Sequence, residues 1–161
     1  MKSAETLADY LKPPYNYYVK IACATGLRVS DVLKLKVKQL KQKHYYVKEE
    51  KTGKKKEVYV PKKLREDMAR YAIRKGYTDN DFFFKSPRKP DKHITRQTIF
   101  KQIKKASLLA KISGNIAPHS CRKYYANKVY KKKSKNIQKV QKALNHSNPT
   151  ETLIYLFDNE E

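Results

Sequence analysis

Six side chains that could together attack a phosphodiester occur in four short motifs of this 161-residue sequence. They are Arg28 in A-T-G-L-R-V-S-D, Lys51 in K-T-G, His119 and Arg122 in H-S-C-R, and His146 and Tyr155 in L-N-H-S-N-P-T-E-T-L-I-Y. In-line attack on a phosphodiester spreads negative charge over the non-bridging oxygens, which then need fixed positive charge or strong donors. A guanidinium is planar, permanently charged and bidentate towards phosphate, so Arg28 and Arg122 are the candidates for this role.

The remaining side chains could supply the nucleophile and the proton transfers. A free phenol has a pKa of about 10, so a tyrosine nucleophile needs nearby positive charge or a base to ionise. Tyr155 is the candidate, and its attack would keep the bond energy in a phosphotyrosyl link, which suits cutting and rejoining without ATP. Lys51 could protonate the leaving deoxyribose oxygen, and His119 and His146 could bind the phosphate or move the tyrosine proton.

Each of these residues also has an ordinary explanation when taken alone. Tyr155 is one of 13 tyrosines and by itself indicates packing. Asp31 could be only a helix N-cap. The choice of general acid stays open, because Lys51 shares its turn with Lys54, Lys55 and Lys56. The agreement of order, local context and spacing over the whole set is what favours chemistry.

No metal ion and no other cofactor are expected. The sequence has no carboxylate cluster of the kind that two-metal nucleases use. It has no C-x-x-C, and His44 and His93 have no nearby ligand partner for zinc. Cys23 and Cys121, the only cysteines, are predicted to be small core residues of a reduced cytosolic protein.

The charge of the chain predicts double-stranded DNA as its partner. The sequence has 38 Lys+Arg against 15 Asp+Glu, a formal net charge of +23, which an anionic partner would neutralise. The alternative is the lysine-rich composition of an AT-rich genome. The candidates for contacts with the DNA backbone are Lys54, Lys55, Lys56, Lys123, Lys131, Lys132 and Lys133.

No apolar stretch reaches the roughly 18 residues of a membrane span, and no secretion signal opens the chain. We therefore expect no membrane partner and a cytoplasmic location, in a bacterial cytosol or nucleoid or in a phage-infected cell.

The elements that must position these side chains are mostly helices. Apolar residues at helical spacing predict helices over 4–11, 15–25, 62–75, 95–111, 120–131, 136–144 and 150–157, and a short one after a cap at Ser30 or Asp31. Gly26 and Asn145 are predicted left-handed stops. Runs at 44–47 and 58–60 predict a β-hairpin around the K-T-G turn, and 81–84 a short buried extended piece. The predicted class is α+β, mainly α-helical with a small antiparallel sheet near residues 44–61.

The four motifs resemble those of the catalytic domain of tyrosine recombinases, the phage integrase family, from about Ser3 to Tyr155. By this resemblance Tyr155 is the nucleophile, Lys51 the general acid and His119 an aid to proton transfer. Arg28, Arg122 and His146 would hold the phosphate, and Asp31 would support the site. The family usually has Gly in place of Asn145, Glu in place of Asp31, and an N-terminal domain that closes around DNA.

The resemblance implies a single catalytic domain over residues 1–161, without the N-terminal DNA-clamp domain. It implies a site-specific recombinase of a phage or mobile element that works as a tetrameric synaptic complex, while the isolated domain could be a monomer. Three alternatives stay open. They are a catalytically silent basic DNA-binding module of the same fold, a relaxing enzyme like the type IB topoisomerases, and a basic RNA- or ribosome-associated protein, which charge alone permits.

Overall fold

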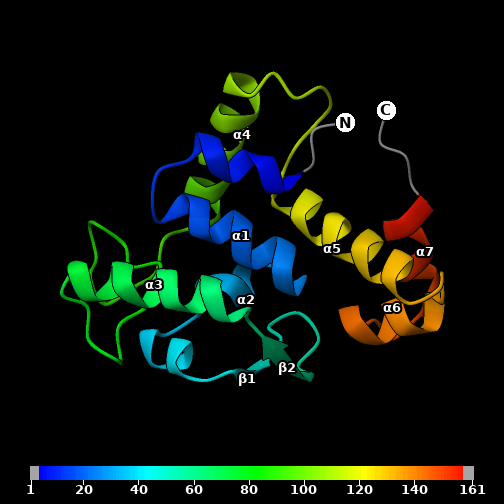
Figure 1. Ribbon diagram of the computed structural model, residues 1–161, viewed down its shortest axis with the longest axis horizontal. Coiled ribbons are helices and arrows are strands. Elements are labelled where there is room, and N and C mark those ends of the chain that lie inside the picture. Colours follow the sequence, from blue (N-terminus) through cyan, green and yellow to red (C-terminus); the bar gives the residue numbers. More distant parts are fainter. Residues whose placement is uncertain (1–3, 158–161) are drawn as a thin grey trace.

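The computed structural model describes residues 4–157, except for the side chain of Tyr155. Its elements, with η for 3-10 helices, are η1 (Ala4–Tyr10), α1 (Tyr15–Thr25), α2 (Val29–Leu33), η2 (Val37–Lys41), β1 (His44–Lys48), β2 (Lys55–Tyr59), α3 (Lys62–Arg74), α4 (Arg96–Leu109), α5 (Pro118–Lys132), α6 (Ile137–Leu144) and α7 (Pro149–Phe157). Helices dominate, and the strands of the described residues form one small antiparallel sheet (Figure 1). The predicted mainly α-helical α+β class is confirmed.

The helix α1 lies at the centre of the fold (Figure 1), in contact with η1, α2, α3 and α5. Its sequence is apolar nearly all round, and Tyr18, Val19, Ile21 and Ala22 are almost fully buried. A helix that is apolar on every side is stable only when other elements cover it. The main hydrophobic core therefore forms around α1, and the turn that follows it has a fixed position.

The predicted helix stops after α1 and α6 are confirmed. Gly26 adopts φ +70° and Asn145 φ +60°, both left-handed. At Gly26 a second constraint acts, because an added Cβ would lie 2.2 Å from Cδ1 of Tyr125. Glycine is thus required there both for the backbone angle and for the close approach of α5.

The hairpin β1–β2 pairs His44 with Tyr59 and Lys48 with Lys55. Its inward-facing side chains, among them Tyr45, Val47 and Val58, belong to the main core. The turn is closed by two backbone bonds, from Glu49 N–H to the carbonyl of Lys54 and from Gly53 N–H to the carbonyl of Glu49, both 2.8 Å. The core thus anchors the hairpin while the turn with Lys51 remains at the surface.

Three local predictions were wrong. The N-cap of α2 is Arg28, in an extended conformation, rather than Ser30 or Asp31. The strand β2 begins at Lys55, three residues before the predicted start. Phe83 and Phe84 are buried as predicted, but they lie in a turn. Their rings pack on Tyr17, Tyr18 and Tyr71, and this packing overrides the preference of aromatic residues for extended backbone.

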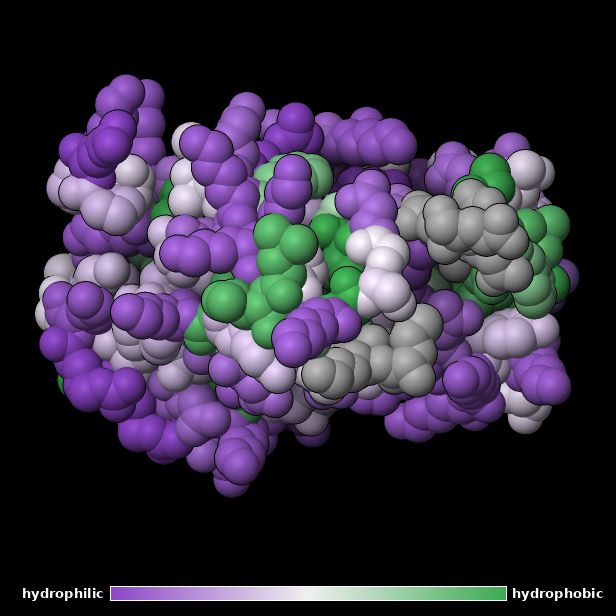
Figure 2. Space-filling model, turned by 90° about the horizontal axis from the view of Figure 1, so that it is seen from above, coloured by the Kyte–Doolittle hydropathy of each residue, from purple (hydrophilic) through white to green (hydrophobic). Residues whose placement is uncertain are grey.

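The helices α5, α6 and α7 form a second, smaller packed region at one end of the molecule (Figure 1). Its fully buried side chains are Ala126, Val140 and Leu144, with Leu156 and others half-buried against them. Exposed hydrophobic side chains of α7 are Leu153, Ile154 and Phe157. Figure 2 shows hydrophobic surface at this end and a second hydrophobic patch near the middle of the same, mostly hydrophilic, face.

Cys23 and Cys121 are both buried and unbridged, as predicted for small core residues. A hydrogen bond with Cys121 and burial together raise the pKa of the Cys23 thiol. Among the helices of the described residues, none is long and apolar enough to cross a membrane.

Candidate active site

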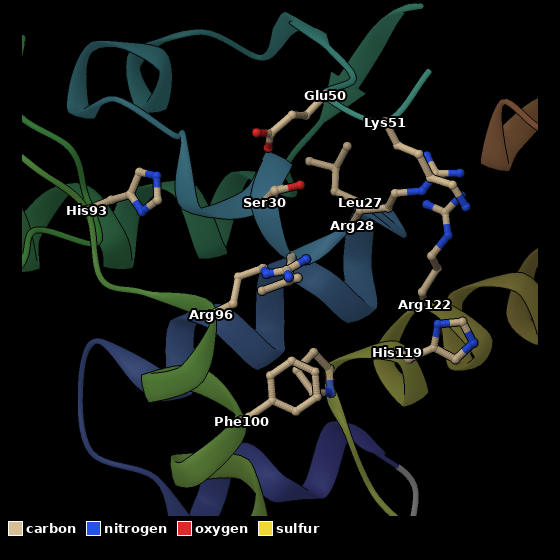
Figure 3. Close-up of a pocket in the computed structure, with 12 residues that line it drawn as sticks. Leu27, Arg28, Ser30, Glu50, Lys51, His93, Arg96, Phe100, His119 and Arg122 are labelled. Carbon is tan, nitrogen blue, oxygen red and sulfur yellow. The ribbon is translucent and has the colours of Figure 1, made fainter. Parts of the chain in front are cut away.

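Four of the predicted site residues line one cleft of about 780 Å³. Arg28 comes from the α1–α2 turn, Lys51 from the hairpin turn, and His119 and Arg122 from the start of α5. Figure 3 shows the charged ends of Arg28, Lys51 and Arg122 lying close together, with His119 beside them. These segments lie up to about 95 residues apart in the sequence, and the fold brings the positively charged side chains of Arg28, Lys51 and Arg122 together.

Arg28 is held on one side and open on the other. Its Nη1 donates to Oε2 of Glu49, and its side chain keeps 15% of its surface exposed. A guanidinium has five N–H donors in a planar fork. The contact with Glu49 therefore fixes the plane of Arg28 and leaves other donors directed at the cleft.

Arg122 is almost completely buried, with 3% of its surface exposed. Its Nη1 donates to the carbonyl of Gly26, and its Nη2 donates to the carbonyl of Leu144 at 3.0 Å. Carbonyls at helix C-termini attract cations because they lack intrahelical partners. Arg122 therefore joins the end of α1 to the end of α6 while it lines the cleft.

His146 does not line the cleft. It lies behind Arg122 and contacts the guanidinium of that residue. The Nη2 of Arg122 lies 3.3 Å from Nε2 of His146, and Nδ1 of His146 lies 3.0 Å from Oγ1 of Thr152. Burial, with Arg122, Arg28 and Lys51 adding to it and Glu151 opposing, lowers the pKa of His146 to about 4. The imidazole is therefore neutral near pH 7, with Nε2 accepting from Arg122 and Nδ1–H donating to Thr152.

Asp31 is buried below the hairpin turn. Its Oδ1 accepts from the backbone N–H of Glu50 at 3.1 Å and lies 3.0 Å from Nζ of Lys34. Asp31 thus holds the backbone next to Lys51 through the amide of Glu50, and its supporting role in catalysis stays a prediction. On the other side of the turn, Nζ of Lys54 donates to Oγ of Ser147 at 2.6 Å.

The other lysines predicted to contact DNA do not gather at this cleft. Lys55, Lys56, Lys132 and Lys133 line a separate groove of about 810 Å³ between β2, α5 and α6. Lys56 is half-buried, and its Nζ donates to the carbonyl of Thr25 at 3.3 Å. Burial, with Arg122 and Arg28 adding and Glu49 opposing, lowers the pKa of Lys56 to about 8. Its inward orientation fits support of the α1 terminus better than contact with a DNA backbone.

Lys123 and Lys131 line neither the cleft nor the groove. Lys123 is half-buried on α5, and Lys131 is exposed near its C-terminal end. The structure therefore distributes the predicted backbone contacts over several surfaces.

The backbone of Tyr155 is part of the helix α7. The predicted nucleophile is its side chain, which lies outside the described part of the structure. The turn before α7 is described. From this turn His146 forms hydrogen bonds with Arg122 and with Thr152 of α7, and so connects the start of α7 to Arg122.

Sequence reasoning missed Glu49, which is 2% exposed and bonded to both Arg28 and Asn145. A signal was available in the hairpin. Burial alternates along β1, with Tyr45 and Val47 inward, and Glu49 continues that alternation. A carboxylate at an inward position requires a buried partner. Sequence reasoning also missed His93, Arg96 and Phe100, which line the opposite wall of the cleft (Figure 3).

Within residues 4–157, no group of three or more His, Cys, Asp or Glu side chains could hold a metal ion. The charged groups that face the cleft are chiefly Arg28, Lys51, Arg96 and Arg122, with Glu50 as an acid on its rim. Such an arrangement can bind an anion and stabilise added negative charge on it.

The sequence is similar to those of known proteins. The sequence pattern described as "Phage integrase family" matches residues 1–161. A probable integrase/recombinase, YoeC, from Bacillus subtilis is 32% identical over 133 residues, covering 82% of this chain and 71% of the relative. A tyrosine recombinase from Pseudothermotoga lettingae is 32% identical over 156 residues, covering 96% of this chain and 51% of the relative.

Solved structures share the fold. The XerA recombinase superposes with a TM-score of 0.78 at 24% identity, over 98% of this chain and 57% of that one. A lambda integrase tetramer bound to a Holliday junction superposes with a TM-score of 0.71 at 19% identity, over 96% of this chain and 47% of that one. The chain thus spans about half the length of several of the proteins that it resembles.

Proposed function

The chain belongs to the phage integrase family of tyrosine recombinases, and on this premise we propose that it cuts and rejoins double-stranded DNA through a 3′-phosphotyrosyl intermediate. The observation that carries the proposal is the meeting of Arg28, Lys51, His119 and Arg122 at one cleft. These four side chains come from three separate segments and have no shared structural need to meet. The expected biological role is site-specific recombination for a phage or another mobile element.

The scissile phosphate would lie between Arg28 and Arg122. Both guanidiniums are fixed before DNA arrives, Arg28 by Glu49 and Arg122 by the carbonyls of Gly26 and Leu144. Fixed donors need no reorganisation as charge develops on the non-bridging oxygens. The bound anion would raise the pKa of the His146 imidazole, and the protonated ring would then have an Nε2–H to donate towards the same phosphate.

Cleavage would form one bond to phosphorus and break another. The phenolate oxygen of Tyr155 attacks phosphorus, the new phosphotyrosyl bond forms, and the bond from phosphorus to the 5′ oxygen breaks. Lys51 gives its proton to the leaving 5′ oxygen, and His119 assists removal of the phenol proton. Rejoining is the reverse with another 5′ hydroxyl, so neither ATP nor a metal ion enters the balance.

The partners follow from charge and from the relatives. A net charge of +23 supports attraction to DNA through phosphates, with an affinity that falls steeply as salt rises. A structural neighbour, lambda integrase, is a tetramer on a Holliday junction. We extend this arrangement to the present protein, with several protomers acting on two duplexes and the single domain acting as a monomer in isolation.

Covalent trapping tests this proposal directly. The wild-type protein and a Tyr155→Phe variant are incubated with nicked duplexes drawn from the DNA that flanks its gene, and denaturing gels report protein-linked DNA. We expect a linked band with the wild-type protein only, and sequencing of that band gives the cleaved bond.

Two other outcomes would identify the alternatives. Salt-sensitive DNA binding without a linked band on any flanking duplex would indicate a silent DNA-binding module. A linked band accompanied by relaxation of supercoiled plasmid, with no strand exchange between two duplexes, would indicate a relaxing enzyme like the type IB topoisomerases.

A further inference from the structure

Glu49 is a buried carboxylate directly after β1, two residues before Lys51, and both of its oxygens accept hydrogen bonds. Its Oε2 accepts from Nη1 of Arg28, and its Oε1 accepts from Nδ2 of Asn145 at 2.7 Å. These partners lie 21 and 96 residues away in the sequence. One side chain thus connects the α1–α2 turn, the hairpin and the α6–α7 turn.

Those three segments are the ones that carry Arg28, Lys51 and His146. Each would otherwise be positioned by a different part of the fold. Arg28 follows the central helix α1, Lys51 is in a surface turn, and His146 is in the smaller C-terminal region. The contacts of Glu49 set the distances between these segments in a way that no local sequence preference can.

Asn145 has a side-chain function in addition to its backbone angle. Glycine would adopt φ +60° at least as readily and would end α6 equally well. Its side-chain amide, which glycine lacks, donates to Oε1 of Glu49. The asparagine at this position is therefore explained by its bond to Glu49, and the pair spans the hairpin and the α6–α7 turn.

The charge of Glu49 is unfavourable for attracting DNA. A carboxylate beside Arg28 repels a phosphate and cancels part of the field of the arginine. Its burial with two matched donors is the arrangement expected of a group that orients its partner. Orientation is worth a large factor in rate, since a displacement of about 1 Å can slow a reaction by roughly a hundredfold.

We propose that Glu49 is a positioning residue for strand cleavage, which orients Arg28 towards the scissile phosphate and, through Asn145, fixes the hairpin of Lys51 against the turn of His146. This inference rests on the proposed function. It predicts an opposite effect on two measurable steps, because removal of Glu49 should strengthen DNA binding and weaken cleavage.

Glu49 variants test the opposite effects. Glu49→Ala should slow single-turnover cleavage by about a hundredfold, while Glu49→Gln, which keeps an acceptor for Arg28, should slow it by about tenfold. Both should bind nonspecific duplex DNA as tightly as the wild-type protein or more tightly. Glu57→Gln is the matched control, since it makes the same charge change on the same hairpin at an exposed position. It should bind DNA slightly more tightly and cleave at the wild-type rate.

Asn145 variants test the second contact. Asn145→Gly should keep the turn and slow cleavage by less than about tenfold. Asn145→Asp should be slower than Asn145→Gly, because two carboxylates would then face each other. Adding Glu49→Gln to Asn145→Asp removes this repulsion and should recover cleavage relative to Asn145→Asp alone.

The outcomes separate the two proposals. If the wild-type protein forms no protein-linked DNA, the proposed function and this inference both fail. If the wild-type protein cleaves and Glu49→Ala cleaves at the same rate, only the positioning role fails. A loss of cleavage matched by equal losses of DNA binding and thermal stability would also overturn it, since that pattern belongs to a merely structural residue.

Discussion

The two parts of the proposed active site differ in how many apolar side chains are buried beneath them. Arg28 and the carbonyl of Gly26 follow the central helix α1, which the main hydrophobic core surrounds. His146 and the helix α7 rest on a cluster whose fully buried side chains are Ala126, Val140 and Leu144. Local opening is easier where fewer apolar side chains are buried. We therefore expect the region proposed to hold the phosphate to be the more rigid one, and the region that carries α7 to open more easily.

Arg122 belongs to both regions. Its two Nη atoms donate to the end of α1 and to the end of α6, at Gly26 and Leu144. The contact from Glu49 to Asn145 is a second connection between the regions. These contacts attach the base of α7 to groups of the proposed site, so we expect a bound phosphate to influence the position of this helix.

The largest expected effect is the loss of this shared connection. Arg122→Lys keeps the charge but replaces the planar fork, whose two Nη atoms reach separate carbonyls, by a single ammonium nitrogen on a flexible stem. We expect single-turnover cleavage to fall by about a hundred- to a thousandfold, with nonspecific DNA binding nearly unchanged. Arg74→Lys, at the C-terminal end of α3, makes the same change away from the cleft and serves as the control. Equal losses of cleavage and DNA binding would reduce Arg122 to an electrostatic role.

The stability of the rigid region depends strongly on Gly26. Gly26→Ala should destabilise the protein by about 3 kcal/mol or more, because left-handed strain costs about 1–3 kcal/mol and the new Cβ would also meet the Tyr125 ring at 2.2 Å. Gly76→Ala isolates the strain, since Gly76 has φ +72° and open space around it. Chemical denaturation of both variants measures the difference. If they lose equal stability, the contact between Gly26 and Tyr125 contributes nothing.

The contrast between the regions is sharpened by two identical substitutions. Leu33 and Leu144 are both fully buried, the first in the main core and the second in the smaller cluster. Each change to Ala should cost about 2–5 kcal/mol of local packing energy. Leu33→Ala should lower the midpoint of global unfolding, whereas Leu144→Ala should mainly increase hydrogen exchange in α6 and α7. Uniform exchange in both variants would show that the molecule opens as one unit.

The sequence predicted the parts of this arrangement that depend on local pattern. Helical spacing, the left-handed positions Gly26 and Asn145, and the hairpin around Lys51 are all encoded within a few residues. Three of the four motifs meet at the basic cleft, which Arg28, Lys51, His119 and Arg122 line, while His146 of the fourth motif contacts Arg122 from outside the lining. Their catalytic roles stay predictions until cleavage is measured.

The remaining features depend on partners far away in the chain. Nothing near Glu49 in the sequence reveals Asn145, 96 residues later, or shows that Arg122 donates to two helix ends. The same holds for Phe83 and Phe84, where contacts with Tyr17 and Tyr18 replace extended backbone by a turn. Local sequence preference predicts helices and strands. Contacts between residues far apart in the sequence decide which polar groups have hydrogen-bond partners and how the positively charged side chains are oriented.

The smallest expected effect is a pH dependence confined to the less densely packed region. The pKa of His146 is lowered from its ordinary value of about 6.5 to about 4, so between these values the unfolded chain takes up a proton that the folded chain does not. The contribution of His146 to the free energy of unfolding should therefore be constant above pH 6.5 and should fall as the pH drops to 4, by at most about 3 kcal/mol. Exchange in α7 should rise first, since protonation places a charge beside Arg122, Arg28 and Lys51, which the carboxylate of Glu151 opposes in part. His146→Gln should flatten this slope, while His44→Gln, at an exposed position on β1, should leave it unchanged. Should the slope survive in His146→Gln, acid sensitivity would belong to the carboxylates of the rigid region, and the difference between the two regions would rest on packing alone.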